Sequence, residues 1–198
     1  MTNEFSSQTI LIGGITGGLG SALAIRLVQA GYTVAGYSRD DGKVGALQEA
    51  APGVQWFSGD AEDAESVENV FAQVEDQVGP VGGYAHCVGS ILVKSAHQVS
   101  DDEWHGTIRR NLDSAFFALR SAVKRMQRRK AGSLVFVSTG AAFGGLPAHE
   151  PIAAAKAGVE GLVRSAAASY ASRGLRVNAV APGMMDTPLA QPIIGSET

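Results

Sequence analysis

The chain has 198 residues and a mass of 20.4 kDa, which is enough to bury one hydrophobic core and predicts a single domain over residues 1–198. Lys and Arg number 16 against 19 Asp and Glu, for a formal net charge of -3, so the composition lacks the positive field that typifies nucleic-acid-binding proteins. The one cysteine, Cys87, excludes an intramolecular disulfide and is typical of a reducing compartment. The sequence shows neither a signal peptide nor an apolar run of about 20 residues. We therefore expect a cytoplasmic protein that engages neither membranes nor nucleic acid.

The first half of the chain alternates short aliphatic runs with longer amphipathic segments. Aliphatic and β-branched runs bounded by turn residues predict strands, which fall at 8–12, 32–37, 54–57 and 84–88. Apolar residues at helical spacing predict two helices between these strands, at 21–30 and 66–78.

The second half continues this alternation. Ser100 and Glu103 have the spacing of a capping box, which predicts the start of a long helix that ends near Lys130. Its last turns are basic, and because cations favour the carboxyl end of a helix dipole, we expect a solvated helix end there. A strand, an alanine-rich helix and a last strand follow at 133–138, 151–173 and 176–180.

Six strands joined by helices in this order predict the fold class. Strand–helix alternation builds a parallel sheet with helices on both faces. The sequence therefore predicts an α/β fold, a single Rossmann-like doubly wound parallel sheet with six strands. Ligands of such sheets bind at the carboxyl ends of the strands.

A glycine cluster joins the first strand to the first helix. Gly14, Gly18 and Gly20 allow a tight turn, a close backbone approach to a pyrophosphate, and close packing of the helix on the strand. The alternative is a flexible turn without a ligand, but its place at the start of a strand–helix series favours a dinucleotide site. The predicted cofactor contacts of this turn are Gly14, Thr16, Gly17, Gly18, Leu19 and Gly20.

The end of the second strand predicts the form of the dinucleotide. Ser38 stands where a ribose-binding carboxylate is expected, and Arg39 follows it. Guanidinium pairs with phosphate through two hydrogen bonds, so we expect NADP, with its 2′-phosphate, rather than NAD. Asp40 and Asp41 keep NAD open as the less favoured cofactor, because an acidic residue about 20 positions after the glycines typically binds the ribose hydroxyl. A solvated charged loop also explains both aspartates.

Together these motifs resemble the short-chain dehydrogenase/reductase family, and the resemblance runs from the first strand to the end of the chain. It implies that Asp60 and Ala61 contact the adenine and that Gly89 lies beside the cofactor. It also implies cofactor contacts of the loop near the nicotinamide, at Pro182, Gly183 and Thr187. The family further implies a homodimer or homotetramer acting on a small-molecule substrate. It usually continues into a lid and a seventh strand, which we expect to be missing here.

The family resemblance also indicates catalytic residues, and here the sequence departs from the pattern. Asn111, Thr139 and Lys156 stand at the positions of the family's asparagine, serine and lysine, but Ile152 occupies the place of the proton-donating tyrosine. His149, seven residues before Lys156, is a candidate substitute. The alternative is an ordinary histidine in the loop before a helix.

Two further departures lie under the predicted cofactor site. Gly13 replaces the usual threonine of the glycine turn, and His86-Cys87-Val88 replaces the family's Asn-Asn-Ala before Gly89. We expect His86 to be half-buried, and Cys87 to pack as a small hydrophobe. The separated histidines do not have the spacing of zinc ligands, so no metal site is expected.

The resulting hypothesis is an NADP-dependent oxidoreductase that transfers a hydride between NADP(H) and a carbonyl or alcohol, or an activated double bond. Because Ile152 cannot donate a proton, the alternative is a catalytically degenerate NADP-binding protein that acts as a sensor or an assembly partner. A different nucleotide, such as a flavin, is compatible with the fold but has no specific residue in its favour.

Overall fold

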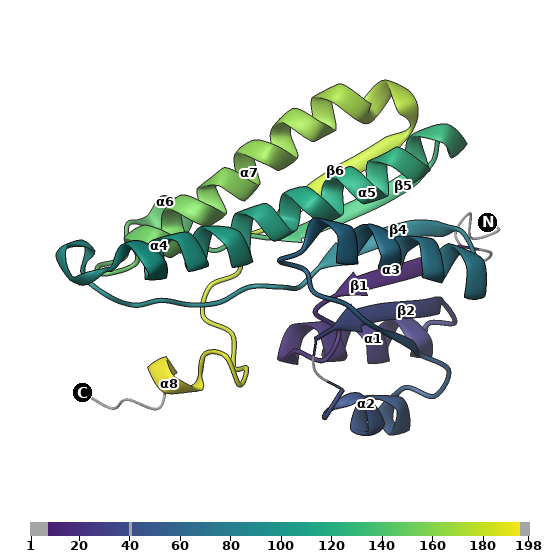
Figure 1. Cartoon of the computed structure of the whole chain (residues 1–198), viewed down its shortest axis with the longest axis horizontal. Helices are drawn as coiled ribbons and strands as arrows, with labels where there is room; N and C mark the ends of the chain where they lie inside the picture. Colours follow the sequence, from purple (N-terminus) through teal and green to yellow (C-terminus); the bar gives the residue numbers. More distant parts are fainter. Residues whose placement is uncertain (1–7, 40, 195–198) are drawn as a thin grey trace.

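The computed structural model describes residues 8–39 and 41–194. Six parallel strands form one sheet in the order β3-β2-β1-β4-β5-β6 (Figure 1). This order confirms the predicted doubly wound α/β class, because the chain starts in the middle of the sheet and extends it first to one side and then to the other. The strands are β1 (Thr9–Gly13), β2 (Thr33–Ser38), β3 (Gln55–Ser58), β4 (Val81–His86), β5 (Gly132–Val137) and β6 (Leu175–Val180).

Helices connect the strands and cover the sheet. The buried side chains of α3, α5 and α7 belong to one hydrophobic cluster, on one face of the sheet. Those of α1 and α2 belong to a second cluster, on the other face. None of the helices within the described ranges is long and apolar enough to cross a membrane. The helices are α1 (Gly18–Gln29), α2 (Val44–Ala50), α3 (Ala64–Gln77), α4 (Asp101–Ile108), α5 (Ser114–Arg129), α6 (Ala141–Gly144), α7 (Glu150–Tyr170) and α8 (Gln191–Ile194).

Strand β1 shows how the sequence divides the core into two layers. Leu11 and Ile12 are both fully buried, yet Leu11 belongs to the cluster under α3 and α5 while Ile12 belongs to the cluster under α1. Successive side chains of a strand point to opposite faces. A continuous apolar run therefore buries both faces of the central strands, as parallel sheets require.

Several predicted boundaries were wrong in informative ways. Helix α1 begins at Gly18 rather than at 21, and α2 was not predicted because only Val44 and Leu47 bury its apolar side. The predicted long helix is interrupted by a π-helical stretch, Arg109–Asp113, between α4 and α5. Strand β4 ends at His86, so Cys87 and Val88 lie beyond it.

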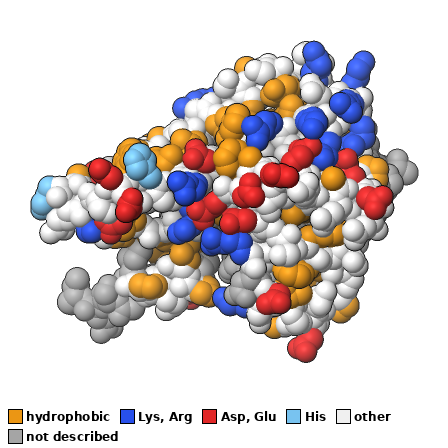
Figure 2. Space-filling model, viewed as in Figure 1, with side chains coloured by type: hydrophobic (Ala, Val, Ile, Leu, Met, Phe, Trp, Pro, Cys, Tyr) orange, Lys and Arg blue, Asp and Glu red, His pale blue; other side chains and the backbone are white. Residues whose placement is uncertain are grey.

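The basic end of α5 is not simply solvated, contrary to the sequence prediction. Glu68 on α3 accepts hydrogen bonds from Lys124 at 2.8 Å and Arg125 at 2.9 Å, while Glu75 pairs with Arg125 and Arg129. Acidic and basic side chains meet along α3 and α5 in Figure 2. Burial alone would raise the pKa of Glu68, but the hydrogen bonds from Arg125 and Lys124 outweigh it and lower this pKa to about 2. The basic run therefore joins two helices.

Candidate functional site

The glycine turn leaves β1 in a conformation that needs glycine. Gly14 has a φ of 76°, in the left-handed region. Its N–H donates to the carbonyl of Tyr37 at 2.9 Å, which ties the turn to the end of β2. A Cβ on Gly20 would run into the carbonyl of Gly14. The turn thus brings the amino end of α1 close to the backbone, with Gly17 at the N-cap, as an anionic ligand requires.

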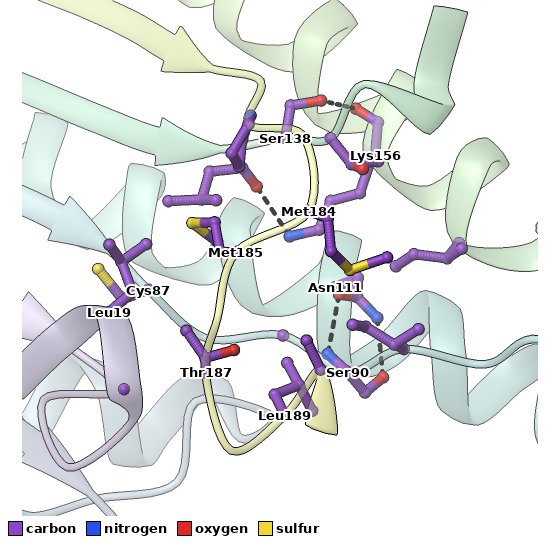
Figure 3. Close-up of a pocket in the computed structure, with 18 of the residues that line it drawn as sticks. Leu19, Cys87, Ser90, Asn111, Ser138, Lys156, Met184, Met185, Thr187 and Leu189 are labelled. Carbon is purple, nitrogen blue, oxygen red and sulfur yellow. Dashed lines mark hydrogen bonds between the residues drawn. The ribbon is translucent and has the colours of Figure 1, made fainter. Parts of the chain in front are cut away.

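A cavity of about 690 Å³ opens beside this turn. It extends from the amino end of α1 to α7 and is walled on one side by the segment after β6, as Figure 3 shows. Eleven predicted site residues line it together although they are spread over most of the sequence: Gly17, Gly18, Leu19, Gly89, Asn111, Thr139, His149, Lys156, Pro182, Gly183 and Thr187.

Other predicted cofactor residues lie outside this cavity. Gly14 and Thr16 belong to the turn, Gly20 is a buried residue of α1, and Ala61 is buried in the core. Ser38, Arg39 and Asp60 lie at the carboxyl ends of β2 and β3. The Ser38 hydroxyl accepts a hydrogen bond from Nε1 of Trp56 at 2.9 Å. Asp40 lies outside the described residues, and Asp41 is exposed.

Asn111 sits in the π-helical stretch and is completely buried. Its Oδ1 accepts from the N–H of Ser90 at 3.1 Å, and its Nδ2 donates to Oγ of Ser90 and to the carbonyl of Thr107, both at 3.0 Å. A Cβ on Gly89 would lie 3.0 Å from Oδ1. Asn111 thus fixes the loop after β4 against the helix. The sequence analysis missed Ser90, whose one signal was its place after Gly89.

Lys156 projects from α7 toward the end of β5. Its Nζ donates to the carbonyl of Val137 at 2.8 Å, and the residue is only 6% exposed. Burial disfavours the ammonium form and lowers the pKa of Lys156 to about 8. Thr139 lies just beyond β5 and lines the same cavity, where its Oγ1 accepts from the N–H of Ala141 at 3.3 Å. A cation and a hydroxyl therefore share one end of the cavity.

Ile152 and His149 lie on or just before the first turn of α7, on the cavity side. Ile152 stands four residues before Lys156, one helical turn away, and is 4% exposed. It presents only carbon to the cavity. Nδ1 of His149 lies 2.7 Å from the carbonyl of Pro147; because a carbonyl only accepts, Nδ1 carries the proton. In the neutral ring Nε2 is therefore an acceptor.

A chain of buried hydroxyls joins β2, β4 and α5 in the core and corrects the expectation that His86 is half-buried. His86 is 1% exposed, and its Nδ1 lies 2.8 Å from Oη of Tyr84, which in turn lies 3.0 Å from Oη of Tyr37. Nε2 of His86 lies 3.1 Å from Oγ of Ser114, which donates to the carbonyl of Arg110 at 2.6 Å.

The end of this chain sets its direction. Because Ser114 gives its proton to a carbonyl, its oxygen accepts from His86 Nε2, and Nδ1 then accepts from Tyr84. Burial, aided by the nearby charge of Lys156, lowers the pKa of His86 to about 3, so its ring is neutral. The signal in the sequence was the spacing of Tyr84 and His86, which share one face of a strand.

The same chain accounts for Gly13, which the sequence resemblance marked as a departure. A Cβ on Gly13 would lie 2.6 Å from Oη of Tyr84 and 2.9 Å from Oη of Tyr37. Glycine is therefore required there while both phenols are present. The thiol of Cys87 lines the cavity, and burial raises its pKa to about 12, so it is not a nucleophile at neutral pH.

Across residues 8–39 and 41–194, no cluster of three or more His, Cys, Asp or Glu side chains is arranged to hold a metal ion.

Comparison with known proteins places this architecture among enzymes. Residues 8–197 match the family model described as short chain dehydrogenase. The chain is 32% identical over 193 residues to a 3β-hydroxysteroid dehydrogenase of Mediterraneibacter gnavus, an alignment that covers 95% of this chain and 70% of the relative. It is 33% identical over 184 residues to a 3-oxoacyl-[acyl-carrier-protein] reductase of Staphylococcus aureus, covering 90% of this chain and 75% of the relative.

Solved structures agree with these relatives. A short-chain type dehydrogenase/reductase from Mycobacterium ulcerans superposes with a TM-score of 0.92 at 26% identity, covering 98% of this chain and 74% of that one. The structure of ElxO with NADP bound superposes with a TM-score of 0.89 at 25% identity, covering 96% of this chain and 79% of that one.

Proposed function

Because this chain belongs to the short-chain dehydrogenase family, we propose that residues 1–198 form one dinucleotide-binding domain of an NADP-dependent oxidoreductase. Its substrate is a small molecule whose carbonyl or alcohol carbon, or activated double bond, exchanges a hydride with the cofactor. The observation that carries this proposal is the single cavity that joins the glycine turn at one end to Asn111, Thr139 and Lys156 at the other. The relatives are named as enzymes, so the catalytically degenerate alternative is not favoured.

The residues around the cavity fit a dinucleotide. The amino end of α1 faces it through Gly17 and Gly18, where backbone N–H groups and the helix dipole favour a pyrophosphate. Ser38, Arg39 and Asp60 would bind the adenosine end, and Gly89, Pro182, Gly183 and Thr187 the nicotinamide end. NADP(H), when bound, supplies or accepts the hydride. The preference for NADP over NAD is supported by the guanidinium of Arg39, which suits a 2′-phosphate.

Three side chains would organise the reacting end of the cavity. Lys156, whose amine already lies among polar backbone groups, would bind ribose hydroxyls. Thr139 would donate its hydroxyl hydrogen to the substrate oxygen and so stabilise negative charge as it develops there. Asn111 would act as a positioning residue, because its hydrogen bonds to Ser90 and Thr107 hold the loop that forms the cavity wall.

The proton on the substrate oxygen needs a donor other than Ile152, which stands at the family's tyrosine position. We propose that the protonated ring of His149 is this donor. Nδ1–H would stay hydrogen-bonded to the carbonyl of Pro147, while Nε2–H would give its proton to the substrate oxygen during reduction and so leave a neutral ring with Nε2 as an acceptor. A positioned general acid typically contributes about 10² to 10⁴ in rate. This makes His149 the residue on which turnover most depends.

The cavity wall also favours an apolar substrate. The side chains that line the cavity include Ile91, Leu146, Met184 and Leu189. Met184 and Leu189 both come from the segment after β6, and Met184 lies next to Lys156 in Figure 3. Apolar walls with a few polar groups are typical of sites that orient a small organic ligand. A substrate with an uncharged hydrocarbon portion next to its reacting carbon fits this surface.

Self-association and a cytoplasmic location complete the proposal. Phe116 on α5 is 45% exposed, Trp104 on α4 is 39% exposed, and the guanidinium of Arg120 lies 5.5 Å from the ring centre of Phe116. Exposed aromatic side chains of this kind commonly mark protein interfaces. If a homodimer or homotetramer buries this face, Phe116→Asp should weaken the association between subunits. Light scattering during size-exclusion chromatography measures this change.

Titration of the purified protein with NADPH and NADH tests the proposed function, with Trp56 beside Ser38 as a fluorescent reporter. We expect tighter binding of NADPH, and oxidation of NADPH with members of a panel of apolar ketones and aldehydes. Lys156→Ala and His149→Gln should reduce turnover at least about 10²-fold. Arg164→Gln, an exposed position on α7, serves as the control. Binding of neither nucleotide would overturn the proposal.

A further inference from the structure

An acidic side chain lies beside the residue that is proposed to bind the 2′-phosphate. Oε1 of Glu62 is 3.3 Å from Nη1 of Arg39 and 2.8 Å from Nε of Arg110. Glu62 follows the adenine-contact pair Asp60-Ala61, whereas Arg110 comes from the π-helical stretch 48 residues further along the chain. One carboxylate oxygen is therefore shared between two guanidiniums from distant parts of the chain.

The carboxylate is the fixed member of this group. The side chain of Glu62 is only 15% exposed, and its backbone N–H donates to Oδ1 of Asp60 at 2.9 Å. The contact with Arg110 is short, while Arg39 is 59% exposed and reaches Glu62 through a single nitrogen. Arg39 is thus free to turn toward a ligand, but Glu62 stays where it is.

A fixed negative charge at this position affects the two cofactors differently. A 2′-phosphate carries about -1.5 to -2 charges at neutral pH, so it would be attracted to Arg39 and repelled by Glu62. A ribose 2′-hydroxyl carries no charge and donates a hydrogen bond, which a carboxylate accepts. We infer that Glu62 is a specificity-determining residue that opposes the 2′-phosphate and so limits the preference of this site for NADP over NAD.

The opposite role, in which Glu62 orients Arg39 for the phosphate, is less well supported by the geometry. A single long contact from an exposed arginine contributes little to holding that side chain. A phosphate offers the same arginine two charge-assisted hydrogen bonds. The ligand would therefore displace the contact and leave Glu62 paired with Arg110 alone, so the repulsion between the carboxylate and the phosphate is only partly offset.

This inference rests on the proposed function, and binding measurements separate the two. Dissociation constants for NADPH and NADH are measured by Trp56 fluorescence for the wild type and for Glu62→Gln. Glu65→Gln is the matched control, because it removes an exposed acidic side chain from the first turn of α3, close to Glu62 in the sequence. Glu62→Asp keeps the charge. We expect Glu62→Gln to lower the dissociation constant of NADPH about threefold to fivefold without lowering that of NADH. This gain in NADPH affinity should shrink when the salt concentration is raised from ~50 mM to ~300 mM. Glu65→Gln and Glu62→Asp should keep the wild-type ratio.

Three results would overturn the inference. Weaker NADPH binding by Glu62→Gln would show that Glu62 orients Arg39, and an equal change for both cofactors would show that it does not discriminate. If the wild type binds neither nucleotide, the proposed function fails and the inference fails with it. Circular dichroism checks that Glu62→Gln is folded. If it is not, Glu62→Ala and the ratio of adenosine 2′,5′-bisphosphate to AMP binding give the same comparison.

Discussion

Replacing Gly13 by alanine should destabilise the protein, although most strand glycines gain from such a change. The added Cβ would lie 2.6 Å from Oη of Tyr84 and 2.9 Å from Oη of Tyr37. Both rings are at most 1% exposed, and their hydroxyls belong to the hydrogen-bonded chain that continues through His86 to Ser114. They cannot turn away without breaking hydrogen bonds.

The expected cost follows from these contacts. Overpacking of a core typically costs about 1–3 kcal/mol, and each disrupted hydrogen bond adds about 0.5–1.5 kcal/mol. An unstrained Gly→Ala change within a strand instead stabilises by about 0.5–1 kcal/mol. We therefore expect Gly13→Ala to lower the free energy of unfolding by about 2–4 kcal/mol, with a sign opposite to the usual one.

Urea denaturation of a double-mutant cycle measures this effect. Tyr84→Phe removes the nearest oxygen, so the cost of Gly13→Ala should fall by at least about 1 kcal/mol in that background. Gly161→Ala, in α7 with open space around the position, is the control and should be neutral or stabilising by up to about 1 kcal/mol. A neutral Gly13→Ala, or an equal cost in both backgrounds, would refute the proposed steric conflict.

Other predictions concern the buried histidine, the tyrosine position and the thiol. Because the pKa of His86 is lowered to about 3 by burial, the unfolded chain binds a proton that the folded chain does not between pH 6.5 and that value. The free energy of unfolding should therefore fall with decreasing pH, by about 1.4 kcal/mol per pH unit at most. The fall should be less steep in His86→Phe but unchanged in His97→Gln, as urea titrations at several pH values would show. Because His149 is the proposed acid, Ile152→Tyr should change turnover little in the wild type, but it should recover much of the ~10²-fold loss of His149→Gln if a phenol one turn before Lys156 suffices as the acid. Ile152→Phe should not, and equal activity of both in that background would contradict this. With its pKa raised to about 12, the Cys87 thiol should resist iodoacetamide at pH 7.5 in the folded protein and react after unfolding, and rapid labelling of the native protein would be inconsistent with its burial.

Local patterns in the sequence were sufficient to predict the sheet and one end of the site. The glycines at 14, 18 and 20 predict a turn, and the structure gives each a reason: Gly14 has a φ of 76°, a Cβ on Gly20 would run into the carbonyl of Gly14, and a Cβ on Gly18 would crowd Thr187 and Pro188. Apolar periodicity predicts all six strands, since a strand buried on both faces reads as a continuous aliphatic run. The spacing of Lys156 to Ile152 identifies a helical face, and both residues line the cavity.

Other features depend on residues that meet only in the folded chain. Tyr37, Tyr84, His86 and Ser114 form one hydrogen-bonded chain because β2, β1, β4 and α5 pack together, which no local pattern encodes. The π-helical stretch at Asn111 was not predicted, because the amphipathic pattern of the sequence continues through it without a break. In the structure Asn111 and Ser114 donate side-chain hydrogen bonds to the backbone carbonyls of Thr107 and Arg110 there.

The sequence by itself determined the class of fold and the glycine turn, because these depend on backbone conformation and on the period of apolar side chains, whereas most of the other residues expected around a dinucleotide came from the family resemblance. Tertiary structure alone decided that Glu62 lies between Arg39 and Arg110, that Gly13 makes room for two phenols, and that the basic end of α5 joins α3. Charge pairing and steric fit between distant segments depend on how the layers pack. They become visible only when the sheet and its helices are assembled.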